Sequence, residues 1–257
     1  MNEFIKNGNK VFTRPSGSDY TLESGATYVL KYDAWGGYGY LEVSNKIKLP
    51  ENYFCSNTDK KFISKVLNYF NLKNKSTVGV MLTGLKGSGK TITSKKIALD
   101  SKLPIIIVDT QFPANRLQDF FDKFNQEVVV IFDEIEKNKD RWDSEKLLNF
   151  LDGISNTCKK IVIFTCNSDE KLCDFIKDRC SRVRYWKTFN ELPEADVYEL
   201  CLRELEDESK ASSLTSFITQ NFKTISFDNV LSFVEELKMD ENCSYEELLN
   251  DLNIHKK

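Results

Sequence analysis

The 257-residue sequence predicts an α/β protein built on a doubly wound parallel sheet, with a small β-rich N-terminal domain and a helical C-terminal domain. Three observations predict this class. Alternating, aromatic-rich residues fill the first 50 positions, short unbroken apolar runs then alternate with helical periodicity, and only helical patterns remain after residue 190. The predicted boundaries are 1–52, 53–190 and 191–257.

The N-terminal segment predicts a β-hairpin. In "ATYVLKYDAWGGYGYLEVSNKIKLP", two strand-like runs flank Gly36, Gly37 and Gly39, and Pro50 closes the segment. The hairpin carries five aromatic residues, namely Tyr28, Tyr32, Trp35, Tyr38 and Tyr40. They could pack the core of a small domain, dock a partner or stack on bases, but few lysines accompany them, which disfavours nucleic acid.

The central region alternates strands and helices. Apolar runs at 78–82, 104–108, 128–132 and 160–165 are short and rich in Val and Ile, as in parallel strands covered on both faces. Helical segments are predicted near 58–70, 116–124 and 144–154. Residues 193–253 then read as helices only, and Ser244 with Glu247 forms a capping box for the last of them.

Composition excludes several classes of function. The net charge of −3 argues against a broad electrostatic grip on nucleic acid. We expect no transmembrane helix and no secretory signal, hence a cytoplasmic protein without a membrane partner, because no apolar run is long enough. The seven cysteines form no CxxC pair and the chain has one histidine, so we expect reduced thiols and no zinc site.

A phosphate-binding loop is predicted at "GLKGSGKT", residues 84–91, which fits G-x-x-x-x-G-K-S/T between a strand and a helix. Its glycines let backbone amides surround an anion, and the helix N-terminus adds its dipole. Lys90 is placed to reach the β- and γ-phosphates and Thr91 to ligate Mg²⁺. The residues predicted to bind the nucleotide are Gly84, Lys86, Gly87, Ser88, Gly89, Lys90 and Thr91, together with Asp133.

Polar side chains end the next two buried strands. Asp133 and Glu134 follow "VVVIF", and Asn167 follows "KIVIFTC", at the sheet edge where ligands of open α/β sheets bind. Asp133 would hold Mg²⁺ through water, Glu134 would polarise the attacking water, and Asn167 would fix the water or the γ-phosphate. The simpler alternatives are solvated carboxylates and a turn asparagine.

The order of these parts resembles the AAA+ ATPases. Residues 78–91 are similar to the Walker A strand and loop, "VVVIFDEIEK" to Walker B, and "IVIFTCN" to the sensor-1 strand. The stretch "KLLNFLDGIS" is similar to the helix and turn of the AAA family proper, and the whole array resembles AAA ATPases of tailed bacteriophages. The resemblance covers about residues 55–257 and implies ATP and Mg²⁺ as cofactors, and host cytoplasm for a phage protein.

The resemblance also gives a role to the arginines in "KDRCSRVRY", residues 177–185. Arg179 and Arg182 are similar to the R-x-x-R of AAA proteins, which acts on ATP held by the neighbouring subunit. A guanidinium suits this task because it stays charged and forks onto phosphate oxygens. The alternative is a surface pair or a salt bridge. The resemblance implies a homo-oligomer, a ring or spiral of six subunits in most of this superfamily.

The partner is left open by the sequence. Protein-threading relatives present an aromatic pore loop, for which Phe112 and Trp142 are the candidates, although a buried core position suits Phe112 equally. One hypothesis is an ATPase that remodels a protein partner or assembly. The alternative is a loader or switch acting on nucleic acid or another scaffold, and a P-loop kinase comes third.

Overall fold

The computed structural model describes residues 4–13, 21–51, 53–72, 77–138, 147, 149–151, 158–167, 182–189, 192–223, 225–240, 244–245, 248–249 and 252. It divides into two compact units, which are described separately. The first comprises Met1–Thr83 with Thr91–Lys187, and the second comprises Gly84–Lys90 with Thr188–Lys257.

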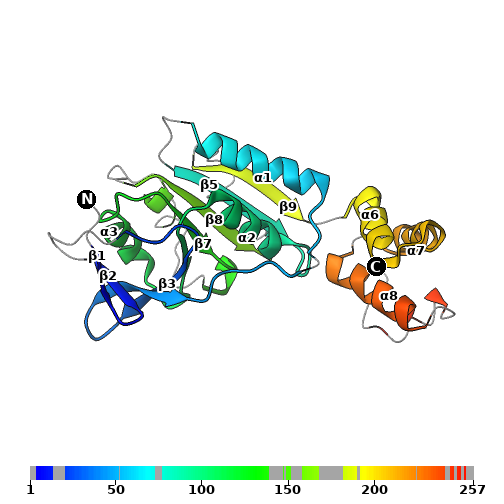
Figure 1. The fold of residues 1–257 in the computed structure, drawn as a ribbon, viewed down its shortest axis with the longest axis horizontal. Helices are drawn as coiled ribbons and strands as arrows, with labels where there is room; N and C mark the ends of the chain where they lie inside the picture. Colours follow the sequence, from blue (N-terminus) through cyan, green and yellow to red (C-terminus); the bar gives the residue numbers. More distant parts are fainter. Residues whose placement is uncertain are drawn as a thin grey trace. The chain divides into compact units, whose positions relative to one another are not determined.

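The first unit is organised around one sheet (Figure 1). Its strands are β1 (Phe4–Asn7), β2 (Lys10–Thr13), β3 (Thr27–Asp33), β4 (Tyr38–Ser44), β5 (Thr77–Gly84), β6 (Ile105–Val108), β7 (Val128–Phe132), β8 (Lys160–Cys166) and β9 (Val183–Phe189). Among the described residues the sheet has nine strands in the order β1-β2-β4-β3-β6-β7-β8-β5-β9. Strands far apart in sequence are therefore neighbours, which long helical crossovers make possible.

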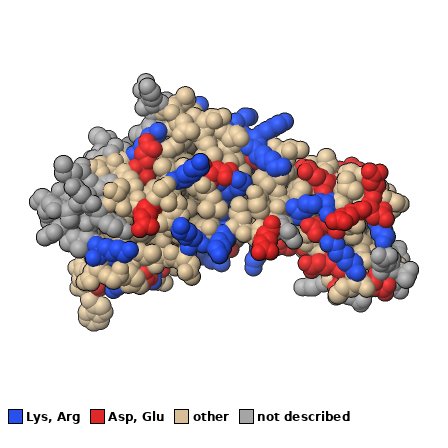
Figure 2. Space-filling view, in the orientation of Figure 1, with Lys and Arg blue, Asp and Glu red and all other residues tan. Residues whose placement is uncertain are grey.

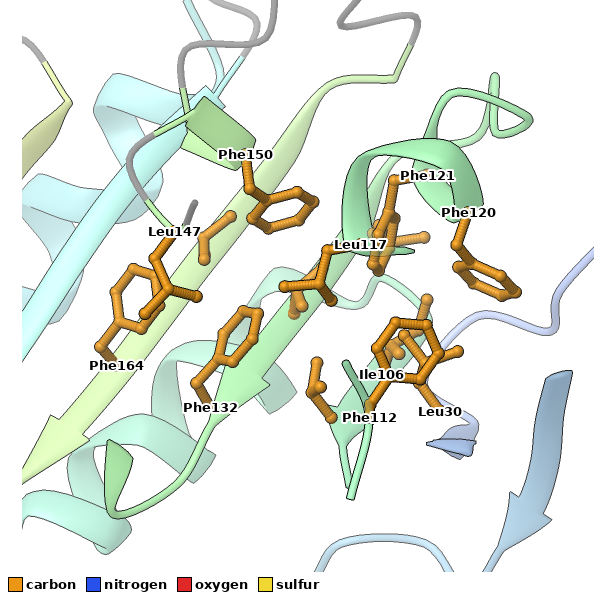
Figure 3. Packing of buried hydrophobic residues seen from close by; sticks show 14 of the residues in the cluster. Leu30, Ile106, Phe112, Leu117, Phe120, Phe121, Phe132, Leu147, Phe150 and Phe164 are labelled. Carbon is orange, nitrogen blue, oxygen red and sulfur yellow. The ribbon is translucent and has the colours of Figure 1, made fainter. Parts of the chain in front are cut away.

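The centre of the sheet is parallel, as the apolar runs predict. β3, β6, β7, β8 and β5 pair in parallel, in that order. The two central strands β7 and β8 are buried along their whole length. Phe132 and Phe164 are register partners whose rings stack at 4.9 Å between centroids, and both belong to the apolar cluster shown in Figure 3. Burial on both faces explains why these runs show no polar alternation.

The N-terminal segment differs from the separate small domain that we expect from sequence. The predicted hairpin β3–β4 forms, but β3 also pairs in parallel with β6 through Thr27–Leu30, so β1–β4 extend the same sheet. β4 packs closely on the α/β core, because a Cβ at Gly39 would lie 2.9 Å from the Phe112 ring. The aromatic and β-branched composition of this segment therefore reflects an antiparallel extension of the central sheet.

Hairpin aromatic residues divide between core and surface. Tyr28 is 1% exposed, and its hydroxyl accepts a hydrogen bond from the backbone N–H of Glu23. Trp35, at the turn, is fully exposed, and Asp33 accepts hydrogen bonds from the N–H groups of Trp35 and Gly36. The turn is thus held by its own aspartate, as is usual for Asp at such positions.

The helical elements of the first unit lie between its strands. They are α1 (Asn57–Phe70), α2 (Lys90–Ser101), η1 (Ala114–Arg116), α3 (Leu117–Phe121) and η2 (Ile135–Asn138). The helix expected near 116–124 is a 3-10 turn followed by a short α-helix. Of the helix expected at 144–154, residues 147 and 149–151 are described and helical, while the others lie outside the described residues.

α1 shows why such a segment forms a helix here. Ser56 caps it by accepting a hydrogen bond from the N–H of Asp59, and its apolar face buries Ile63, Val66 and Phe70. Asp59 in turn pairs with Lys187 of β9 at 2.5 Å. This pair and the apolar face anchor α1 to the edge of the sheet beside β5.

Phe112 belongs to the core. It is fully buried, and its ring contacts Tyr32 and Phe120 edge-on at centroid distances of 5.9 and 6.2 Å. The pore-loop interpretation of Phe112 is therefore wrong, and the core alternative is confirmed. The second pore candidate, Trp142, lies outside the described residues.

The second unit contains the C-terminal helices α6 (Glu194–Leu205), α7 (Glu208–Asn221) and α8 (Phe227–Met239). Asp207 and Ser226 cap α7 and α8 through their side chains, and Lys238 of α8 contacts Glu204 of α6 at 3.1 Å. Acidic residues outnumber basic ones in these helices, as Figure 2 shows for one face.

Two other expectations concern helices. At the end of the chain, Leu248 N–H donates to the Ser244 carbonyl at 3.1 Å, but Glu247 of the expected capping box lies outside the described residues. Among the described helices, none is both long and apolar enough to cross a bilayer.

Candidate active site

The phosphate loop, residues 84–91, leads from the carboxyl end of β5 into α2. Gly87 and Gly89 adopt φ angles of +73° and +97°, a region that side chains other than glycine rarely occupy. Ser88 is buried, and its hydroxyl donates to the Leu85 carbonyl at 2.5 Å, so this side chain closes the loop. The sequence motif therefore folds into the turn that backbone anion binding needs.

Lys90 is held inside this loop. Its side chain is buried, and its ammonium donates to the carbonyls of Gly84 and Leu85 at 2.8 and 2.6 Å. Burying an ammonium group without hydrogen-bond partners is unfavourable, and these two carbonyls of the loop stabilise the Lys90 charge and fix its position. The exposed positions of the loop are Lys86 and Thr91, the latter in the first turn of α2.

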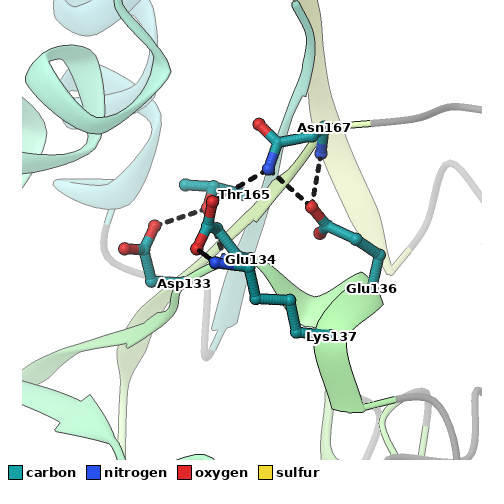
Figure 4. Close-up of polar contacts among 6 residues, drawn as sticks. All are labelled: Asp133, Glu134, Glu136, Lys137, Thr165 and Asn167. Carbon is teal, nitrogen blue, oxygen red and sulfur yellow. Dashed lines mark hydrogen bonds and ion pairs between the residues drawn. The ribbon is translucent and has the colours of Figure 1, made fainter. Parts of the chain in front are cut away.

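The predicted residues Asp133, Glu134 and Asn167 meet at the carboxyl ends of β7 and β8, where Glu136 and Thr165 join them (Figure 4). We call these five residues the carboxylate edge. The Thr165 hydroxyl donates to Asp133 Oδ1 at 2.6 Å and accepts from the Glu134 N–H at 2.8 Å. One buried threonine thus fixes both members of the predicted acidic pair, across 31–32 residues of sequence.

Asn167 lies between two glutamates. Its Nδ2 donates to Glu134 Oε1 at 2.9 Å and to Glu136 Oε1 at 2.7 Å. Glu134 itself adopts a φ of +48°, an unusual conformation for a residue with a side chain. Such backbone strain is found preferentially at functional sites. The structure therefore brings Glu134 and Asn167 together, as the end-of-strand pattern predicts.

Lys137 adds a positive charge to the edge. Its ammonium forms an ion pair with Glu134 Oε2, and this hydrogen bond raises the pKa of Lys137 above its ordinary value of 10.5. The lysine side chain is largely exposed, so solvent screens the pair. Glu134 is thus contacted by an amide on one oxygen and an ammonium on the other (Figure 4).

Three of these contributors were missed by sequence reasoning: Glu136, Lys137 and Thr165. Glu136 and Lys137 stand in the quoted "DEIEK", where the i+2 and i+3 spacing from Glu134 was the available signal. Thr165 lies inside an apolar run, where a single hydroxyl usually satisfies its own backbone, so nothing in the pattern distinguished it.

The predicted arginines are only partly described. Arg179 lies outside the described residues. Arg182 is half-buried in the turn before β9, and its carbonyl lies so close to Gly79 of β5 that a Cβ there would sit 2.2 Å away. The backbone of Arg182 is therefore fixed against the sheet. Their action on a neighbouring subunit stays a prediction.

Comparison with known proteins supports the architecture. Residues 80–188 match the model of the AAA family, described as the ATPase family associated with various cellular activities. A solved structure of a RuvB mutant from Thermogota maritima is similar in fold, with a TM-score of 0.55 and 15% identity over 79% of this chain and 71% of that chain. No curated protein matches the chain in sequence.

These findings confirm the predicted fold class. The chain has the α/β fold of the AAA+ P-loop NTPases, with a mostly parallel sheet and a helical C-terminal part. The family match includes residues 84–91, the Asp133–Glu134 pair, and strand β8 with the Asn167 that follows it.

Proposed function

We propose that this chain is a Mg²⁺-dependent ATPase of AAA+ type. One observation carries the proposal: Glu134 and Asn167, from two different strands, meet at the carboxyl edge of the sheet and share a hydrogen bond. β7, β8 and β5 are neighbours in that order, and the phosphate loop follows directly from β5. A carboxylate and an amide at one edge of the sheet, in a chain that also carries an anion-binding loop, suit hydrolysis of a phosphoanhydride by water.

Phosphate binding falls to the loop and its lysine. The amides of residues 84–91 and the ammonium of Lys90 would hold the β- and γ-phosphates, because they are the positive groups of this turn. Thr91 and Asp133 offer an exposed hydroxyl and an exposed carboxylate, the hard oxygen donors that Mg²⁺ accepts. Thr91 would bind the ion directly and Asp133 through water. Bound Mg²⁺ would neutralise charge on the triphosphate.

Water activation falls to Glu134. Its carboxylate accepts a hydrogen bond from the Asn167 amide, and phosphoryl transfer depends on orienting the water and controlling charge. Asn167 would orient the water or sense the γ-phosphate. An acceptor-binding role, as in a kinase, fits less well, because the Asp133–Glu134 pair followed by Asn167 and Arg179 suits attack by water better than transfer to an acceptor.

Activity is proposed to require an oligomer. Arg179, with Arg182, would complete the site of the adjacent subunit, and a ring or spiral of six copies is the expected assembly. Support comes from the resemblance of "DRCSR" to the paired arginines of AAA proteins and from the permanent charge of guanidinium. The proposed cellular role is remodelling of a protein partner or assembly, in the host cytoplasm if the chain is phage-encoded.

Mass photometry of the Glu134→Gln protein tests the assembly. Slowed hydrolysis should trap the ATP-bound oligomer, so we expect a shift from monomer toward six copies when ATP and Mg²⁺ are added. A monomer at every concentration would overturn the oligomer, and an absence of ATP turnover by the wild-type protein would overturn the ATPase itself.

Mixed variants test the arginine in trans. Arg179→Ala and Glu134→Gln proteins should each be inactive, and their mixture should recover part of the activity, because one kind of interface joins an intact Glu134 to an intact Arg179. A mixture no more active than its parts, in subunits shown to co-assemble, would contradict the trans role. Stimulation of turnover by protein substrates favours remodelling, whereas stimulation by DNA favours the loader or switch alternative.

A further inference from the structure

Glu136 is the one carboxylate of the edge to which the proposed reaction gives no task. It lies in η2, two residues after Glu134, and its Oε1 accepts two hydrogen bonds from Asn167. These come from the backbone N–H at 3.0 Å and from the side-chain Nδ2 at 2.7 Å (Figure 4). A single oxygen therefore holds both the main chain and the side chain of the same residue.

The second oxygen of Glu136 is shielded from solvent. Oε2 is buried and has no hydrogen-bond partner among the described residues. A carboxylate that activates water must reach solvent or substrate, and a buried oxygen does not. Burying an unsatisfied carboxylate oxygen is unfavourable, so the two hydrogen bonds that Oε1 accepts from Asn167 are formed at a cost in stability.

The contacts of Glu136 also decide which way the Asn167 amide faces. With Nδ2 donating to Glu134 and Glu136 together, the amide nitrogen is directed to the two carboxylates and Oδ1 is directed away (Figure 4). A rotation of the amide by half a turn would place Oδ1 against two negative charges, which is strongly unfavourable. Bonds to ionised acceptors are stronger than neutral ones, so the preference is firm.

We propose that Glu136 is a positioning residue: it holds Asn167 in the orientation in which the amide contacts Glu134. This inference rests on the proposed ATPase function. Glu136 then affects hydrolysis only through Asn167, and it does not touch the nucleotide. Its removal should lower kcat while leaving the affinity for ATP unchanged.

A double-mutant cycle tests the proposal. We expect Glu136→Ala to lower kcat about tenfold or more, with the Kd of a non-hydrolysable ATP analogue within about twofold of wild type. Glu136→Gln keeps an acceptor oxygen on the same stem and should recover most of the activity. In an Asn167→Ala background, Glu136→Ala should have no additional effect. Additive losses, or an equal loss of analogue affinity, would overturn the proposal.

A matched control and a second readout separate this inference from the proposed function. Glu127→Gln changes the same charge at the opposite end of β7, where Glu127 pairs with Lys159 at 3.3 Å, and should leave kcat unchanged. The side-chain amide signal of Asn167, assigned by its loss in Asn167→Ala, should shift in Glu136→Ala and stay near wild type in Glu136→Gln. An unshifted signal overturns the positioning role even in a protein that hydrolyses no ATP.

Discussion

The phosphate loop and the carboxylate edge achieve precise placement by different means. The loop is a single stretch of eight residues whose groups are mostly backbone atoms, held by three glycines at positive φ and by bonds inside the loop. The edge is assembled from side chains more than 30 residues apart, joined by Thr165 and Asn167. The geometry of the phosphate loop should therefore tolerate substitutions elsewhere in the chain. The geometry of the carboxylate edge depends on the register between β7 and β8.

The largest expected effect is in the loop. Lys90→Met removes the only buried ammonium of residues 84–91, and we expect the Kd for ATP to rise about 100-fold. Isothermal titration calorimetry measures this. Lys95→Met, one turn and a half further along α2, is the matched control and should bind like wild type. An unchanged Kd for Lys90→Met would remove the loop from the nucleotide site.

The next effect belongs to the edge and should appear in kcat alone. Glu134→Gln keeps the shape of the side chain but removes its basicity, so we expect kcat to fall by about 10²–10³. The Kd for ATP should stay within about threefold. Steady-state ATPase assays and analogue binding check the two quantities. If affinity fell as steeply as turnover, Glu134 would be a binding group and the division between loop and edge would fail.

A smaller effect is expected from the residue that joins the two carboxylates. Thr165→Val removes the hydroxyl that bonds Asp133 and the Glu134 N–H, at nearly constant volume, so kcat should drop about tenfold. Thr27→Val is a suitable comparison. Thr27 is a buried threonine of β3, away from the carboxylate edge, and its hydroxyl accepts a hydrogen bond from the N–H of Ile47. Equal kcat values in the two variants would show that the hydroxyl of Thr165 contributes packing only.

The smallest effect is expected at the exposed ion pair. Lys137→Met removes the ion pair at Oε2 of Glu134 and should raise kcat by no more than about threefold, because solvent screens the pair. The pKa of Lys137 is raised above 10.5, so the lysine stays charged and the ratio of the two rates should remain constant from pH 7 to pH 10. Rates measured across this range check the prediction. A ratio that collapses below pH 9 would contradict the pairing.

Several features could be predicted from sequence because they depend on neighbours along the chain. Four apolar runs predict the parallel strands, the glycine and lysine spacing predicts the loop, and residues that directly follow strands predict Glu134 and Asn167 at one edge. In each case periodicity or a fixed spacing carries the information. The same reasoning predicts the hairpin β3–β4, whose turn chemistry is local.

Other features required the tertiary structure. β3 pairs in parallel with β6, so the segment whose sequence pattern predicts a separate β domain instead extends the central sheet. Phe112 could have lined a pore or filled the core, and only the packing of Gly39, Tyr32 and Phe120 around it decides for the core.

For the site itself, sequence alone determined the chemical groups and the order in which they occur. Tertiary structure decided which of them touch: Thr165 from within an apolar strand, Glu136 from a 3-10 turn, and Lys137 on Oε2 of Glu134. The physical reason is that hydrogen bonds between strands depend on sheet register and side-chain direction. Neither quantity leaves a periodic trace in the sequence.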